Sequence, residues 1–241
     1  PGQSLRGEQT HEGVRVWNRG NVLVGVSGMW HGARQWKDVT IDLGLVVSND
    51  GVRFREPAHE HVFLKRGRDG AWDQGGLLQG QGFENVGRQT RIYYGAWDPR
   101  VSNRATPRGG VGIAMLPRDR FADLVVDTTT RGSGDYQMKN TVSSFLTSTL
   151  EVDGGAQRFS VNADGLGQGS ALRFELLSHT AKPLPKYSGS NAAIVRASGF
   201  QTPIRWNGQH SLNDLPDRVR LKVTFVGREK AAIRFSAIYA R

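Results

Sequence analysis

Residues 28–31 read Gly-Met-Trp-His and residues 95–98 read Gly-Ala-Trp-Asp, so one Gly-x-Trp-polar segment occurs twice, 67 residues apart. Each copy ends a run of β-branched, aromatic and other apolar residues, and a second such run follows it. These runs span residues 21–28, 40–47, 89–95 and 110–116. Short apolar runs bounded by turn residues are typical of strands. The repeat therefore predicts two four-stranded antiparallel units, each of the size of one β-propeller blade.

A polar segment at residues 128–134 separates these blades from seven shorter apolar runs. The seven runs span residues 145–152, 157–162, 171–177, 194–197, 202–206, 219–226 and 232–239. Strands at intervals of ~8–12 residues are typical of a β-sandwich. The sequence thus predicts an all-β chain with propeller blades at residues 1–127, a linker at 128–144 and a β-sandwich at 145–241.

Two blades do not close a ring, because a propeller needs roughly four to eight of them. Repeat units also bury their faces only against neighbouring repeats. We therefore expect earlier blades of the same protein, N-terminal to Pro1, to be a partner of residues 1–127 and to cover an apolar flank of these two blades.

The composition excludes several classes of protein. With 31 glycines and no cysteine in 241 residues, the chain has no disulfides, cysteine-bound metals or thiol nucleophiles. No stretch reaches the ~18–20 apolar residues of a membrane span. The net charge of +10 is spread along the chain, whereas a nucleic-acid footprint usually gathers on one face, so nucleic acid is not an expected partner. A polyanion-binding alternative predicts salt-dependent retention on heparin. The compartment stays open, with a secreted or periplasmic one favoured.

Glu12-Gly13 begins a predicted strand, and Gly20-Asn21 precedes the next one. This segment resembles the acid-bearing blade of five-bladed propeller glycosidases, the arabinanase/xylosidase and invertase/fructanase clans, with Val14 where those families have proline. Residues 45–57, 70–76, 90–98 and 110–121 are similar to their last blades, and residues 160–208 to their trailing β-sandwich. The resemblance implies the last two blades of a five-bladed propeller followed by the sandwich. It also implies glycoside hydrolysis, with Glu12 as general acid and the other catalytic carboxylates on earlier blades.

Glu12 is the predicted catalytic residue. Glycoside hydrolysis needs two carboxyl groups flanking one bond, one of them protonated, and burial or a neighbouring carboxylate keeps such an acid protonated. If Gly20 lies at the hairpin turn, Glu12 pairs with a residue near 29. Trp30 and His31 then return to the end of the sheet at which Glu12 begins. The alternative for Glu12 is an ordinary surface glutamate in a turn.

Polar residues recur beside the two repeated tryptophans. The 67-residue offset relates Glu12 to Gln79 and His31 to Asp98. A sugar site combines hydrogen bonds to hydroxyls with a flat apolar face for the ring. The predicted substrate-binding residues are His11, Trp30, His31, Asp73, Gln79, Trp97 and Asp98. The alternative for the tryptophans is packing between blades.

The segment His59-Glu60-His61 places two imidazoles on one face of an extended chain, without a third ligand nearby in the sequence. We expect a solvated loop there, with no metal and no cofactor. No serine lies in a Gly-x-Ser-x-Gly nucleophile elbow. These patterns leave acid/base chemistry as the predicted mechanism.

The sequence therefore predicts a glycoside hydrolase-like protein that acts on a polysaccharide or oligosaccharide by acid/base catalysis in a propeller funnel. The alternative is a non-catalytic glycan-binding or scaffold module of the same fold. Carboxylates at the starts of inner strands in the earlier blades would favour the hydrolase. Carbohydrate is the expected partner, while the sugar and the linkage stay open.

Overall fold

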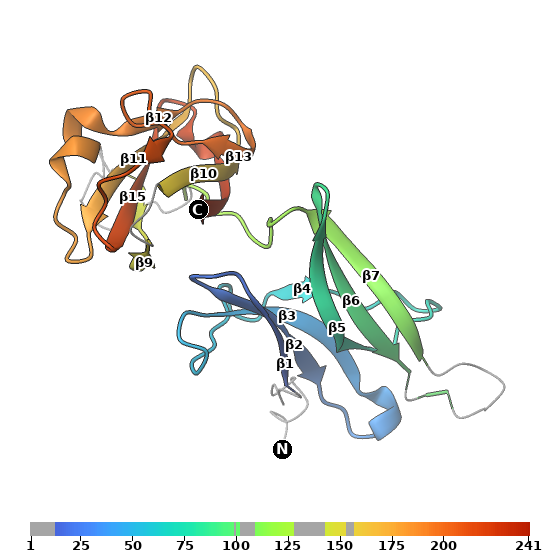
Figure 1. Cartoon of the computed structure of the whole chain (residues 1–241). Coiled ribbons are helices and arrows are strands. Elements are labelled where there is room, and N and C mark those ends of the chain that lie inside the picture. The colour runs from blue at the N-terminus through green and yellow to red at the C-terminus, as the bar shows by residue number, and fades with distance from the viewer. Residues whose placement is uncertain (1–12, 99, 102–108, 128–142, 153–156) are drawn as a thin grey trace, which may run out of the picture. The chain divides into compact units, whose positions relative to one another are not determined.

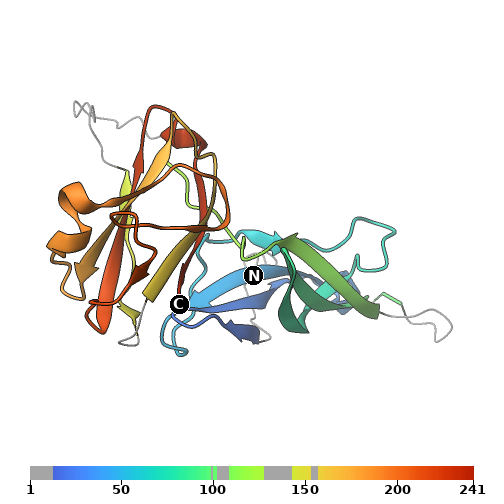
Figure 2. The same ribbon diagram turned by 45° about the horizontal axis from the view of Figure 1, so that its top comes forward.

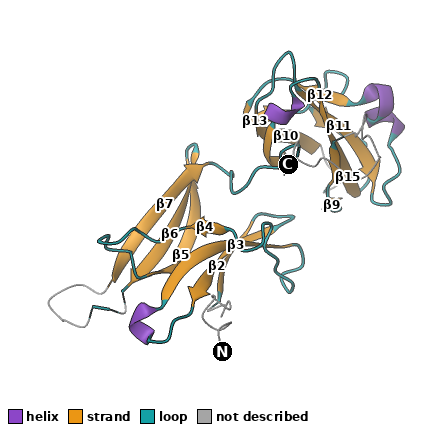
Figure 3. Ribbon diagram, turned by 180° about the vertical axis from the view of Figure 1, so that it is seen from behind, coloured by secondary structure: helices purple, strands orange, loops and turns teal. Residues whose placement is uncertain are grey.

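The computed structural model of the chain describes residues 13–98, 100–101, 109–127, 143–152 and 157–241. Strands make up nearly all the regular structure of these residues, and the helices among them are single 3-10 turns (Figure 3). The predicted all-β class is therefore confirmed. The chain divides into two compact units, Pro1–Pro117 and Arg118–Arg241, called unit 1 and unit 2 below.

Unit 1 is built on one sheet with the strand order β1-β2-β3-β5-β6-β7, in which β4 also pairs with β3 (Figure 1). The strands are β1 Val14–Asn18, β2 Leu23–His31, β3 Thr40–Ser48, β4 Val62–Leu64, β5 Gly76–Val86, β6 Gln89–Trp97 and β7 Gly109–Pro117, with the 3-10 turn η1 at Trp36–Asp38. All pairs are antiparallel except β3 with β5, which meet at one parallel bridge between Ile41 and Gly76. The sheet thus consists of two antiparallel ribbons, β1–β4 and β5–β7.

The two ribbons of unit 1 share an apolar core. Val26 and Leu43 from the first ribbon cluster with Leu77 and Ala96 from the second, and all four side chains are buried. Trp17 of β1 also stacks on Phe83 of β5, with ring centroids 5.6 Å apart. Complete burial of one such aliphatic side chain contributes roughly 1.5–3 kcal/mol. This shared core fixes the ends of the two ribbons relative to each other.

Unit 2 has two antiparallel sheets (Figure 2). One has the order β13-β10-β14 with β16 on β10, and the other has the order β12-β11-β15-β8 with β9 on β15. The strands are β8 Ser144–Leu146, β9 Leu150–Glu151, β10 Gln157–Asp164, β11 Ala171–Ser178, β12 Ala193–Val195, β13 Gly199–Pro203, β14 Ser211–Leu212, β15 Arg218–Val226 and β16 Arg234–Ala240, with 3-10 turns η2 Pro185–Tyr187, η3 Gly189–Asn191 and η4 Lys230–Ala232. Phe159 of β10, Phe174 of β11 and Leu221 of β15 are fully buried in one core, so both sheets contribute to it.

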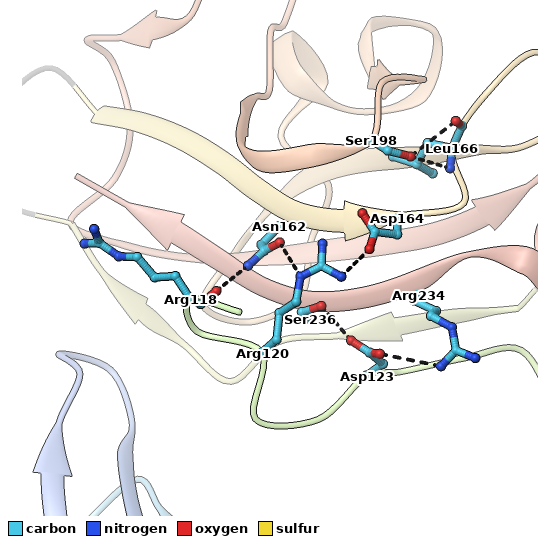
Figure 4. Close-up of polar contacts among 9 residues, drawn as sticks. All are labelled: Arg118, Arg120, Asp123, Asn162, Asp164, Leu166, Ser198, Arg234 and Ser236. Carbon is cyan, nitrogen blue, oxygen red and sulfur yellow. Dashed lines mark hydrogen bonds and ion pairs between the residues drawn. The ribbon is translucent and has the colours of Figure 1, made fainter. Parts of the chain in front are cut away.

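Residues 118–127 group with unit 2, whereas the sequence patterns predict them at the end of the blades. Leu124 forms a two-way backbone bridge with Phe235 of β16. The buried amide of Asn162 donates to the carbonyl oxygen of Arg118 at 2.8 Å (Figure 4). The Tyr239 hydroxyl donates to Oδ2 of Asp119 at 2.8 Å. This segment, called the strap below, takes its hydrogen-bond partners from unit 2, and local sequence patterns carry no information about those partners.

The predicted linker at 128–144 falls mostly outside the described residues, and β8 begins at its last residue. Among the described residues, none of the helices has the length and apolar character that a membrane crossing requires.

Candidate functional site

Five strand ends of unit 1 meet at one end of its sheet. β2 ends at His31, opposite Thr40 at the start of β3. Gly76 at the start of β5 pairs with Trp97 at the end of β6, which in turn pairs with Gly109 at the start of β7. Because the parallel bridge from β3 also reaches Gly76, these ends form one continuous edge. This edge and the loops that leave it are called the rim below.

Gln79 lies where the two ribbons meet. A Cβ atom built on Gly13 would lie 3.4 Å from Nε2 of Gln79, and one built on Gly28 would lie 3.5 Å from its Oε1. The amide therefore sits between the start of β1 and the end of β2. It is placed there by a β-bulge, since the β5–β6 register shifts between Leu78 and Gly82, and bulges re-aim side chains.

Glu12 and His11, the predicted acid and its neighbour, lie outside the described residues. The expected pairing of Glu12 with a residue near 29 uses the same register as the neighbouring strands β1 and β2, in which Val14 pairs with Ser27. Gly13, which follows Glu12 in the sequence, has a φ of 109° and is the residue beside Gln79.

His31 belongs to a three-residue charge cluster. Its Nε2 lies 2.8 Å from Oδ2 of Asp42, and Arg66 donates to the same carboxylate from Nη1 at 2.6 Å and from its backbone nitrogen at 2.8 Å. Asp42 is 3% exposed. Charge-assisted hydrogen bonds of this kind are about twice as strong as neutral ones. The cluster ties the loop after β4 to β3 and orients the imidazole at the rim.

Asp98 is surrounded by donors. Its Oδ1 accepts from the backbone nitrogen and Nε of Arg100 at 2.9 and 2.8 Å, and its Oδ2 accepts from Nη2 of Arg100 at 3.0 Å and from Nε2 of Gln74 at 3.3 Å. Hydrogen bonding from the Arg100 side chain lowers the pKa of Asp98 below its ordinary value of 3.8. The hydrogen bonds thus favour the ionised form of Asp98, and through Arg100 and Gln74 this carboxylate holds two loops together.

Asp73 lies in the loop before β5, next to an exposed tryptophan. Its Oδ2 accepts a hydrogen bond from the Tyr94 hydroxyl at 3.2 Å, and burial, then the charge of Asp73, raises the pKa of Tyr94. Trp72 stacks on Tyr94 with ring centroids 6.1 Å apart and planes 17° apart. Trp72 was not among the predicted site residues. The sequence feature that could have indicated it is its position directly before Asp73 in a glycine-rich segment.

Trp30 and Trp97, the predicted sugar platforms, are both half-buried and occupy matching positions at the rim. Trp30 is opposite Ile41 across β2 and β3, and Trp97 is opposite Gly76 across β5 and β6. Since Ile41 and Gly76 form the parallel bridge, both indoles flank the junction of the ribbons. Asp42, Arg66 and Arg100 are not among the residues that the sequence patterns predict for this site.

The segment His59-Glu60-His61 lies in the loop before β4. His59 contacts Glu56 at 3.3 Å and its side chain is exposed. Within the described part of the chain, no three His, Cys, Asp or Glu side chains gather so as to hold a metal ion. His59 instead borders an open depression of about 460 Å³, which is also lined by Val14, Val46, Phe54, Arg55 and Glu56.

No protein-family model matches this chain, and no curated protein matches it. Among solved structures, the chain is similar to that of a glycoside hydrolase family 43 arabinoxylan arabinofuranohydrolase from Bacillus subtilis in complex with cellotetraose. The identity is 12% and the TM-score is 0.27, over 94% of this chain and 53% of that one. The chain thus spans about half the length of that enzyme.

Proposed function

We propose that the chain is part of a carbohydrate-active protein of the glycoside hydrolase type that binds a polysaccharide or oligosaccharide at the rim of unit 1. The observation that carries the proposal is the position of Gln79, whose amide lies between Gly13 and Gly28. A hydrogen-bonding group thereby lies beside Gly13, which follows Glu12, and it is three residues along β5 from the rim that bears Trp30 and Trp97. Polar groups next to flat apolar faces are the combination that binds sugar rings.

In this proposal Glu12 is the general acid, and unit 1 is the last two blades of a propeller followed by the β-sandwich of unit 2. A general acid must keep its proton at the working pH. The lowered pKa of Asp98 disfavours that role, and Asp42 is ion-paired with Arg66. His31, Asp73 and Gln79 contact substrate hydroxyls, while Asp98 positions Arg100 and Gln74. The second carboxyl group of the reaction is contributed by blades outside this sequence.

The second candidate is a non-catalytic glycan-binding module. The hydrogen bonding of two buried carboxylates at the rim favours this candidate, because Asp42 accepts from Arg66 and Asp98 accepts from Arg100. Such carboxylates stabilise loops and are not available to attack or protonate a glycosidic bond. A module of this kind would bind glycans through the same rim and release no sugar.

The test is the variant Glu12→Gln in the full-length protein, with Glu60→Gln at an exposed position as the matched control. Hydrolysis of a panel of plant and microbial polysaccharides is measured by released reducing sugar. General acid help contributes ~10²–10⁴-fold, so E12Q should lower turnover by about that factor and E60Q should not. Aryl glycosides with good leaving groups should lose much less. Glycan binding without any hydrolysis by the wild type would favour the module, and neither binding nor hydrolysis would overturn the proposal.

A further inference from the structure

Trp72 is the most exposed aromatic side chain among the large apolar residues of the described chain, with 51% of its surface accessible. It lies in the loop at residues 68–74, which precedes β5 at the rim. A single exposed apolar residue needs no special explanation. Trp72 differs from that ordinary case because its ring is held in place from several sides.

Two contacts fix the indole directly. Tyr94 stacks almost parallel to it, with planes 17° apart. On the neighbouring strand, a Cβ atom built on Gly110 would lie only 3.0 Å from Cζ3 of the indole, so the ring approaches the β7 backbone more closely than another residue type would permit without a shift. The side chain therefore has little rotational freedom to lose when a ligand binds, and preorganisation of this kind favours affinity.

The loop beneath Trp72 is held as firmly as the ring. The backbone nitrogen of Gly70 donates to Oε1 of Gln74 at 2.7 Å, and Gln74 donates from Nε2 to Asp98 at 3.3 Å. Ala71 and Gln74 also close two backbone turns within the loop. Asp98, one of the predicted substrate-binding residues, thus also anchors the Trp72 loop.

The charges around Trp72 limit the ligand. Residues 65–75, between β4 and β5, carry two carboxylates, Asp69 and Asp73, and three cations, Lys65, Arg66 and Arg68, of which Arg66 is paired with Asp42. The nearby cation Arg100 is already paired with Asp98. A phosphate or uronate group over the indole would face the Asp73 carboxylate, and like charges this close repel each other. A neutral ring with hydroxyl groups can instead donate hydrogen bonds to that carboxylate while its apolar face covers the indole.

We propose that Trp72 is a stacking platform for a neutral sugar ring, with Asp73 accepting a hydrogen bond from one of its hydroxyls. The inference rests on the proposed carbohydrate-related function and adds to it a subsite at which binding, rather than bond cleavage, takes place. A nucleobase could stack on the same indole, but the phosphates attached to it would be repelled by Asp73.

The test compares Trp72→Ala and Trp72→Phe with Val52→Ala, a control at another exposed apolar residue of unit 1. Binding is measured by affinity electrophoresis in gels that contain neutral arabinoxylan, β-glucan or inulin, and in parallel gels that contain polygalacturonate or heparin. Truncation of a central aromatic anchor typically weakens binding about tenfold or more. We expect W72A to show that loss on a neutral glycan, W72F a smaller loss, and V52A none.

A second variant, Gly110→Ala, keeps the indole but displaces it, and it should weaken the same binding while the fold, measured by near-UV circular dichroism, is retained. Equal binding by W72A and the wild type would overturn the platform, as would tighter binding to the anionic gels or no binding to any neutral gel. Hydrolysis that persists in a W72A protein with unchanged binding would remove the platform and leave the proposed hydrolase function. Trp72-dependent binding by a protein that hydrolyses no glycan would support the platform and remove the proposed hydrolase function.

Discussion

The side-chain amide of Gln74 donates a hydrogen bond to Oδ2 of Asp98, 24 residues further along the chain. It joins the loop before β5 to the loop after β6, and Arg100 completes the junction with three hydrogen bonds to the same carboxylate. One buried anion thus holds both loops that form the Trp72 side of the rim. Its removal should affect both loops together.

We expect Asp98→Asn to lower the free energy of unfolding of the protein by about 1–3 kcal/mol, because it weakens hydrogen bonds to a charged group. Urea denaturation followed by tryptophan fluorescence measures the change. Asp214→Asn is the matched control, since its ion pair with Lys186 is exposed and such pairs contribute little. An unchanged midpoint for D98N would contradict the assigned role.

The ionisation of Asp98 should also make the stability of the protein depend on pH. The pKa of Asp98 is lowered in the folded protein by hydrogen bonding from Arg100, relative to an ordinary value of 3.8. A lowered pKa means that the stabilisation is fully present above the unfolded value and is lost as the pH falls through the folded value. The difference in stability between wild type and D98N should therefore be constant near neutrality and shrink below about pH 4. A difference that grows on acidification would refute this.

Gly80 and Gly82 form a second matched pair, within the bulge that aims Gln79. A Cβ atom on Gly80 would lie 1.4 Å from the carbonyl oxygen of Tyr93, whereas one on Gly82 would meet no atom within 4 Å. Gly80→Ala must displace backbone, so we expect it to cost more than about 3 kcal/mol, at the severe end of single substitutions. Gly82→Ala should change stability by less than about 1 kcal/mol. Thermal melts measure the difference in stability between the two variants. Similar melting temperatures would contradict the close approach of Gly80 to the carbonyl oxygen of Tyr93.

The strap offers a prediction for unit 2. Asn162 of β10 is 1% exposed; it donates to the Arg118 carbonyl oxygen and accepts from Nε of Arg120 at 3.2 Å (Figure 4). Its replacement by Ala leaves buried groups without partners, which costs about 1–3 kcal/mol. Hydrogen exchange of the Leu124 amide, bonded to Phe235 at 2.8 Å, should become faster in N162A. Asn213→Ala, at an exposed position of the same unit, is the control.

Replacement of Asp42 should loosen the loop after β4, on the His31 side of the rim. Asp42→Ala leaves Arg66 and His31 without their shared acceptor, and loss of hydrogen bonds to a charged group costs about 1.5–3 kcal/mol. Limited proteolysis should then cleave after Arg66 or Arg68 faster than in the wild type, because the loop after β4 is no longer tied to β3. Equal cleavage rates would show that the cluster does not hold this loop.

Local sequence patterns determined the β class and the positions of most strands. The predicted run at 89–95 lies within β6 and that at 110–116 within β7, because alternation and turn residues act over neighbouring positions along the chain. The repeat also predicts His31 and Asp98 as binding residues, and both lie at the rim of unit 1.

Only the tertiary structure decided which groups pair across the chain. Asp42 meets Arg66 because β4 pairs with β3, and Trp72 of the loop before β5 stacks on Tyr94 of β6. Residues 118–127 carry a strand-like pattern, yet Leu124 pairs with Phe235 of β16. An apolar pattern specifies that a segment will be extended and partly buried, but the partner that completes its hydrogen bonds depends on the path of the whole chain.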